Sequence, residues 1–95
     1  MNQNLENNKH EPLDAKRKRL RFRSWHRGTK EMDFVLGNFA DKYVFDFESK
    51  QLDLYDRLLN NSDPDLYNWL SGNEPVPPAE DNEVMQLFLR FELIK

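Results

Sequence analysis

The sequence predicts an all-α protein, a small five-helix bundle in a single domain. Apolar residues recur at the three- and four-residue spacing of helices over most of the chain, and no pair of alternating segments flanks a hairpin turn. The chain has 95 residues, enough to bury one core but not two. Its 38% hydrophobic and 13% aromatic residues are typical of a globular domain rather than of a disordered chain.

The first two predicted helices follow a polar segment. Residues 1–12 are rich in asparagine and end at Pro12, so we expect a disordered N-terminal tail and a helical domain over residues 13–95. The first helix runs from Leu13 to His26 without a clean apolar stripe, which predicts that it is the least buried of the set. The second helix has its apolar residues within an arc of about 140°. These are Met32, Val35, Leu36, Phe39, Ala40, Tyr43 and Phe47.

Three further helices follow, each with its own start or stop signal. We expect Ser49 to cap the third helix and residues 60–62 to end it. Asp63, followed by a proline, is the expected cap of the fourth helix, and Gly72 stops it. Prolines make residues 73–78 an irregular connector. The apolar face of the fifth helix, which starts after Asp81, consists of Val84, Leu87, Phe88, Phe91 and Ile94.

Charge is divided unequally along the chain. Residues 1–30 carry a net charge of +6 and residues 31–95 a net charge of −9, which leaves −3 overall. We therefore expect a charge-polarised molecule. A basic patch on an acidic body can steer an oppositely patterned protein partner, or it can mark a nucleic-acid site.

Several classes of function are disfavoured by what the chain lacks. It has no cysteine, which excludes disulfides, thiolate nucleophiles and cysteine-ligated metals. His10 and His26 have no partner at zinc-ligand spacing, and no glycine-rich loop ends in Gly-Lys-Ser/Thr. We expect neither a metal site nor enzymatic activity. The sequence has neither an apolar run of about 18 residues nor a signal core nor an arginine-rich transit pattern. The expected location is therefore cytoplasmic, without membrane insertion.

The segment RGTKE, residues 27–31, joins the basic part of the chain to the acidic part. Each residue has an architectural interpretation. Gly28 can end a helix in the left-handed conformation, and Arg27 can place a cation at the carbonyl end of the first helix. Thr29 can cap the second helix, with Glu31 in its first turn. The same residues can also present donors and an acceptor around a glycine that lets a partner approach the backbone. Both interpretations remain open at this point.

Two motifs together resemble a known family. Arg27-Gly28-x-x-Glu31 precedes Asp63-Pro64-Asp65-Leu66-Tyr67-Asn68-Trp69, and a proline-rich connector and a last helix follow. This order resembles the SdhE family, the flavinylation and assembly factors of succinate dehydrogenase, over about residues 16 to 93. The resemblance implies a five-helix bundle that binds the flavoprotein subunit of succinate dehydrogenase, and in some bacteria of fumarate reductase. It also implies that the factor promotes covalent attachment of FAD to a histidine of that subunit.

The resemblance also implies a partner-binding surface. The signature of the family falls on Arg27, Gly28 and Glu31, with Thr29, Lys30 and Asp33 beside them. By analogy, these residues face the flavoprotein near its flavin site. The factor would act as a chaperone for a conformer in which histidine and flavin are aligned, and not as an enzyme. We expect it to be monomeric when free and to act in the bacterial cytoplasm. The chain has no dinucleotide fingerprint that predicts an FAD of its own.

Two other functions are kept as alternatives. The basic helix, Lys16 to Arg19 with Arg21 and Arg23 and the aromatics Phe22 and Trp25, could bind nucleic acid. A toxin-neutralising or generic adaptor would use the same small surface as the assembly factor. In the second motif, we expect Leu66, Trp69 and Leu70 to be core anchors of the fourth helix rather than partner contacts.

Overall fold

The structure is a computed structural model that describes residues 11–91. In this range it contains five α-helices and two short 3-10 helices, and no β-strand. The predicted all-α, five-helix fold is confirmed. Residues 1–10 of the predicted tail and Ile94 of the predicted last helix lie outside the described range. The elements are α2 (Leu13–Trp25), α3 (Lys30–Tyr43), η1 (Val44–Asp46), α4 (Ser49–Leu59), α5 (Asp63–Leu70), η2 (Pro78–Glu80) and α6 (Glu83–Arg90).

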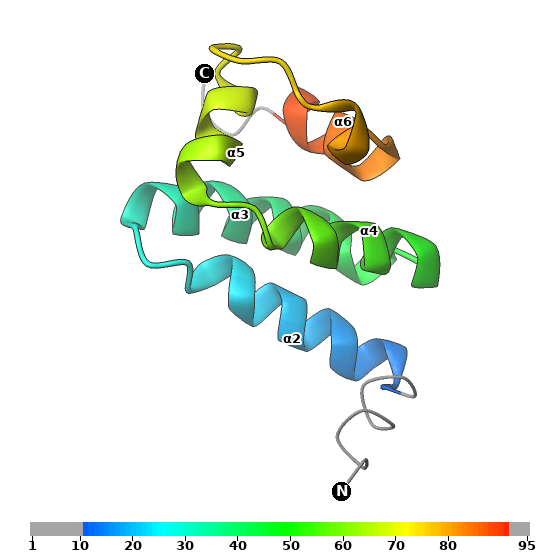
Figure 1. Ribbon diagram of the computed structural model, residues 1–95. Helices are drawn as coiled ribbons and strands as arrows, with labels where there is room; N and C mark the ends of the chain where they lie inside the picture. The colour runs from blue at the N-terminus through cyan, green and yellow to red at the C-terminus, as the bar shows by residue number, and fades with distance from the viewer. Residues whose placement is uncertain (1–10, 92–95) are drawn as a thin grey trace, which may run out of the picture.

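The helices are arranged around the α3–α4 pair. Figure 1 shows α2 on one side of this pair and α5 with α6 on the other. Helix α2 packs against both α3 and α4, and α6 packs against α4 and α5. No helix within residues 11–91 is long and apolar enough to cross a membrane.

An aromatic cluster occupies the core. Phe39 of α3 is fully buried, and its ring lies 5.0 to 5.7 Å, between centroids, from four other aromatic rings. Aromatic pairs at such separations attract beyond the effect of buried area alone. The cluster therefore joins α3 to α4 and to the last helix. Its other members are Tyr43, Tyr55, Phe88 and Phe91. Leu66 and Trp69 are also buried, which confirms them as core anchors of α5.

Helix α2 buries little apolar surface, as its sequence predicts. Only Leu20 and Ser24 of this helix are buried, and Phe22 is exposed. The Ser24 hydroxyl donates to the carbonyl of Leu20 at 2.8 Å and is hydrogen-bonded to the Tyr55 hydroxyl at 2.6 Å. Burial raises the pKa of Tyr55 above its ordinary value. A buried polar contact thus connects α2 to α4 where an apolar stripe is missing.

The second helix ends earlier than predicted. Its apolar pattern continues to Phe47, but α3 stops at Tyr43, and Val44–Asp46 tighten into η1. Tyr43-Val44-Phe45 is a run of aromatic and β-branched residues, which lose side-chain freedom in a helix. Phe47 is extended and still buried, so its place in the core was predicted correctly although its helix was not.

Two predicted helix caps are shifted by one residue. Glu48, not Ser49, caps α4, because the Glu48 N–H donates to the Gln51 side chain in a reciprocal capping box. Ser62, not Asp63, caps α5, because its hydroxyl accepts from the Asp65 N–H at 3.2 Å. The side chain of Asp63 is thereby left for another role.

Candidate partner-binding site

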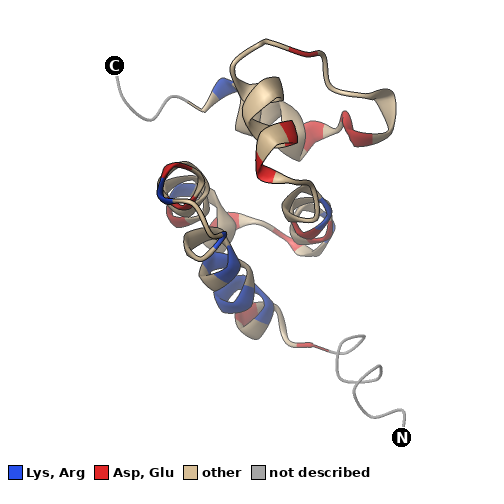
Figure 2. Cartoon of the chain, turned by 60° about the vertical axis from the view of Figure 1, so that its left-hand side comes forward, with Lys and Arg blue, Asp and Glu red and all other residues tan. Residues whose placement is uncertain are grey.

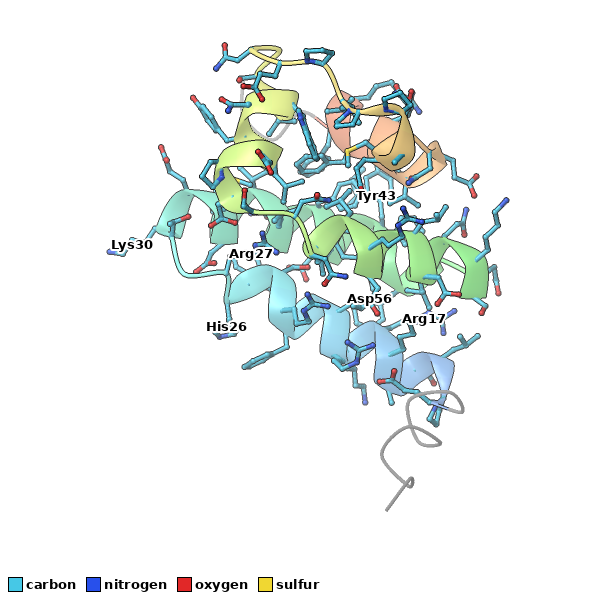
Figure 3. All side chains as sticks on the ribbon, viewed as in Figure 1. Arg17, His26, Arg27, Lys30, Tyr43 and Asp56 are labelled. Atoms are coloured by element: carbon cyan, nitrogen blue, oxygen red, sulfur yellow. The ribbon has the colours of Figure 1, made fainter. Side chains whose placement is uncertain are left out.

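The connection between α2 and α3 contains the predicted site. We call residues 27–31 the elbow. Gly28, Thr29, Lys30 and Glu31 are exposed, whereas Arg27 is partly buried. Figure 3 shows His26 and Lys30 pointing away from the bundle at this corner and Arg27 lying against it. The structure therefore brings the elbow to the surface but withdraws one of its two cations.

Gly28 is required by its backbone conformation and not by crowding. Its φ is +124°, a value that residues with a side chain rarely adopt. A Cβ added at this position would have nothing within 4 Å. Helix α2 has already ended at Trp25, with His26 as its C-cap. Gly28 thus turns the chain into α3 after the helix end, two residues beyond the cap, and leaves open space above its backbone.

Thr29 and Asp33 hold the elbow from the α3 side. Thr29 is the N-cap of α3, as predicted, and its hydroxyl accepts from the Met32 N–H at 3.3 Å. Asp33 lies in the first turn, and its Oδ1 accepts from the Arg27 N–H at 2.5 Å and from the Gly28 N–H at 3.3 Å. A single carboxylate therefore binds two consecutive amides of the elbow. Asp33 is partly buried and its carboxylate is directed at the backbone of the elbow. It therefore holds the exposed residues in place rather than being one of them.

The architectural interpretation predicts that Arg27 places its cation at the carbonyl end of the first helix. The structure contradicts this prediction. Its guanidinium crosses to the junction of α4 and α5, where Nη1 donates to the carbonyl of Leu59 and Nη2 to that of Asn61 at 2.5 Å. Leu59 is the last residue of α4, so the cation stabilises the carbonyl end of that helix instead. The side chain is only 11% exposed. Arg27 therefore acts as a clamp between segments.

Asp63 completes this clamp. Its Oδ1 accepts from Arg27 Nε at 2.9 Å and lies 2.8 Å from Nη2 in an ion pair, and its Oδ2 accepts from the Thr29 hydroxyl at 3.2 Å. The two sequence motifs thus meet through one carboxylate. Sequence reasoning treated Asp63 as a helix cap and missed this contact. The sequence did hold a signal for this contact, because each of the two family motifs contains one member of an oppositely charged pair, Arg27 in the first and Asp63 in the second.

Lys30 and Glu31 lie at the exposed end of the elbow. Both are exposed in the first turn of α3, and neither takes part in an ion pair within residues 11–91. Charged side chains with no partner in the protein are free to meet charges on another molecule. The elbow therefore presents one cation and one anion on a corner whose backbone is held from two sides.

The basic helix has a different environment from the one its charge predicts. Figure 2 shows the Lys and Arg positions of α2 in blue, with red Asp and Glu positions on other helices of the bundle. Lys16 pairs with Asp53, and both Arg19 and Arg23 pair with Asp56 at 3.4 and 2.6 Å. Arg21 pairs with Asp41 at 2.5 Å. The hydrogen bond to Glu11, with the charge of Asp56, raises the pKa of Arg19.

The expectation of a charge-polarised molecule stays a prediction, but the ion pairs reduce the free charge of α2. Folding places two aspartates of α4, Asp53 and Asp56, beside three cations of α2 and offsets part of their positive charge. A nucleic-acid site requires cations that are free to replace the counterions of phosphates. The ion pairs of α2 thus argue against the nucleic-acid alternative.

Comparison with known proteins decides the family. A family model described as the flavinator of succinate dehydrogenase matches residues 18–92. The chain belongs to this family. Succinate dehydrogenase assembly factor 2 of Drosophila grimshawi is 39% identical over 83 residues, which cover 85% of this chain and 56% of the relative. Assembly factor 2-B of Drosophila mojavensis is 42% identical over 79 residues, which cover 81% of this chain and 50% of the relative.

These relatives confirm the resemblance to the SdhE family and correct the expected location. The chain spans about half the length of the curated relatives that it matches. Their names describe these relatives as mitochondrial, which contradicts the expected bacterial cytoplasm. The expectation rested on the composition of residues 1–12. The composition of these twelve residues therefore does not decide the location of the protein.

Proposed function

We propose that this chain binds the flavoprotein subunit of succinate dehydrogenase, or of fumarate reductase, and promotes the covalent attachment of FAD to it. The observation that carries the proposal is the exposed elbow, whose Lys30 and Glu31 form no ion pair within residues 11–91, in a chain that belongs to the flavinator family. The family is one of assembly factors. In the proposed function the chain assists a reaction of its partner and contributes no catalytic residue.

The rigidity of the elbow supports a docking role. Binding is weakened by the cost of ordering loops and side chains at an interface. Asp33 already holds two amides of the elbow, and Asp63 holds Arg27 and Thr29. The elbow is therefore already ordered in the folded protein, and a partner that binds it loses little further free energy in ordering it. Exposed Gly28 adds a stretch of backbone that a partner can approach without meeting a side chain.

The proposed mechanism is a shift of population in the partner. The bond to FAD forms between groups of the flavoprotein, and it needs the target histidine and the flavin held in alignment. A factor that binds the aligned conformer more tightly raises its population, by no more than its differential affinity for the two states. A shift from about 1:99 to 99:1 requires roughly 10⁴-fold tighter binding to the favoured conformer.

Glu31 provides the most direct test. The flavoprotein subunit is co-expressed with wild-type factor, Glu31→Ala or Glu83→Ala, and covalent flavin is measured by in-gel fluorescence. Glu83 is the matched control, because it is also an exposed glutamate in the first turn of a helix, here α6. We expect Glu31→Ala to lower covalent flavin several-fold and Glu83→Ala to leave it unchanged. Circular dichroism checks that both variants are folded. Equal flavin in the two variants would contradict a role for the elbow.

Gly28 provides a second test with its own control. Gly28→Arg introduces both backbone strain and a long side chain on the proposed surface. Gly72, at the end of α5, also has a positive φ, +83°, and open space around an added Cβ. Gly72→Arg therefore produces comparable strain away from the elbow. We expect loss of covalent flavin from Gly28→Arg alone, with both variants folded. If both variants lose activity together, backbone strain and not the surface explains the effect.

A further inference from the structure

Exposed aromatic side chains lie on the helices that begin or end at the elbow. Within the described residues, four large hydrophobic side chains are exposed: Phe22 at 62%, Tyr67 at 52%, Phe45 at 48% and Phe34 at 46%. Phe45 lies in η1, beyond the far end of α3. The other three stand on three different helices that all have one end at the elbow, namely α2, α3 and α5. Their clustering cannot be a consequence of one helix having an apolar outer face.

Each of the three lies one helical turn from a residue at the elbow. Phe22 precedes His26 by four residues, Phe34 follows Lys30 by four, and Tyr67 follows Asp63 by four. Residues four apart share a helix face and are separated by about 5 to 6 Å between Cβ atoms. Asp63 is itself bonded to Arg27 and Thr29. Each of the three aromatics is therefore about one helical turn from a residue that belongs to the elbow, adjoins it or is bonded to it.

Phe22 is also held in place. Its ring stacks on that of His26, with centroids 4.0 Å apart and an angle of 20° between the planes. The His26 Nδ1–H donates to the carbonyl of Phe22 at 2.7 Å. An aromatic side chain that is already ordered loses less entropy when a partner covers it. This is the behaviour expected of a binding residue rather than of a disordered surface side chain.

We propose that Phe22, Phe34 and Tyr67 form the apolar part of the docking surface for the flavoprotein subunit, and that they supply most of its affinity. This inference rests on the function proposed above. The area that a stable complex needs supports this occupant, since a standard interface covers about 800 Å² and 20 to 30 residues on each partner. A partner that covers the elbow must therefore extend at least one helical turn beyond it, onto these rings. Aromatic side chains dominate the binding energy of such interfaces.

The test is the affinity of the full chain for the purified flavoprotein subunit, measured by isothermal titration calorimetry. The variants are Phe22→Ala, Phe34→Ala and Tyr67→Ala. Phe45→Ala is the matched control, because Phe45 is equally exposed but is separated from the elbow by residues 32–43 of α3, about 18 Å of helix. We expect each of the three variants to bind about tenfold more weakly, and the control to stay within about twofold of wild type.

The possible outcomes separate this inference from the proposed function. If wild type binds and all three variants match it, the aromatic surface is refuted and the proposed function stands. If wild type does not bind the flavoprotein, both are refuted. A loss with Phe45→Ala as large as that with Phe34→Ala refutes the inference too, because the effect is then not local to the elbow. Sedimentation of the free chain adds a last outcome: a dimer that these substitutions dissociate makes a second copy the occupant and overturns the assignment.

Discussion

The clamp between Arg27 and Asp63 yields a strong prediction about stability. Arg27→Ala removes a guanidinium that makes two contacts to Asp63 and one to each of two backbone carbonyls. It leaves a carboxylate that is only 19% exposed without its cation. The substitution thus differs from the loss of a surface ion pair, which is worth about 0 to 1 kcal/mol.

The size of the effect follows from the burial of the pair. Removing one partner of a fully buried ion pair costs about 3 to 5 kcal/mol, because the remaining charge is left uncompensated. Both side chains keep some contact with water, at 11% and 19% exposure, so the lower end of that range applies. We expect Arg27→Ala to lower the free energy of unfolding by about 3 kcal/mol. For a domain of this size, that corresponds to a fall in Tm of roughly 12 to 24 °C.

Two further variants define the cause. Arg27→Lys keeps the positive charge but not the planar fork that reaches three acceptors, so we expect it to recover less than half of the lost stability. Lys30→Ala removes the neighbouring exposed cation, which is unpaired within residues 11–91, and should change stability by less than about 0.5 kcal/mol. Urea unfolding followed by circular dichroism measures all three, with an unchanged m-value as the check on two-state behaviour. The clamp is refuted if Arg27→Ala is as stable as Lys30→Ala.

Two other predictions concern the α2 interface. Alanine favours helices, but Gly37→Ala should still lower the free energy of unfolding by about 1 to 3 kcal/mol, because the new Cβ would lie 2.1 Å from the Trp25 ring. Urea titration measures this change. An unchanged midpoint would contradict the packing of Trp25 on Gly37. Burial raises the pKa of Tyr55, so tyrosinate forms first in the unfolded chain as the pH rises. The contribution of Tyr55 to the free energy of unfolding should therefore be constant up to about pH 10 and fall above it. Tyr55→Phe should remove that fall and should also lower the free energy of unfolding at neutral pH. If the free energy of unfolding of Tyr55→Phe falls equally above about pH 10, the titration belongs to other groups.

Local sequence patterns were sufficient to predict the helices and most of the core. The apolar face of α3 and the anchors Leu66 and Trp69 follow from spacing alone, because residues three and four apart share a helix face whatever the rest of the chain does. The Thr29 cap is equally local. Errors of one residue at Glu48 and Ser62 arose because several adjacent polar side chains can serve as caps, and only the entry angle of the chain selects one of them.

Contacts between distant segments could not be predicted in this way. Arg27 and Asp63 are 36 residues apart, and their pairing depends on how the α4–α5 junction packs against α2. The same is true of the ion pairs between α2 and α4, such as Arg23 with Asp56. The count of charges along the chain was correct, but it predicts an exposed basic patch only if the helices do not pair their opposite charges. Tertiary packing therefore decided the role of each cation.

The two interpretations of the elbow prove compatible, because they apply to different residues. Arg27 and Asp33 have their polar groups directed into the protein, and substituting them should reduce stability first. Lys30 and Glu31 are exposed, and Figure 3 shows Lys30 directed outward; under the proposed function their substitution should reduce flavin attachment with stability unchanged. Under the proposed function, a signature that combines both kinds of residue should lose activity from changes at either kind. Only stability and flavin attachment measured on the same variant distinguish a residue that builds the surface from one that touches the partner.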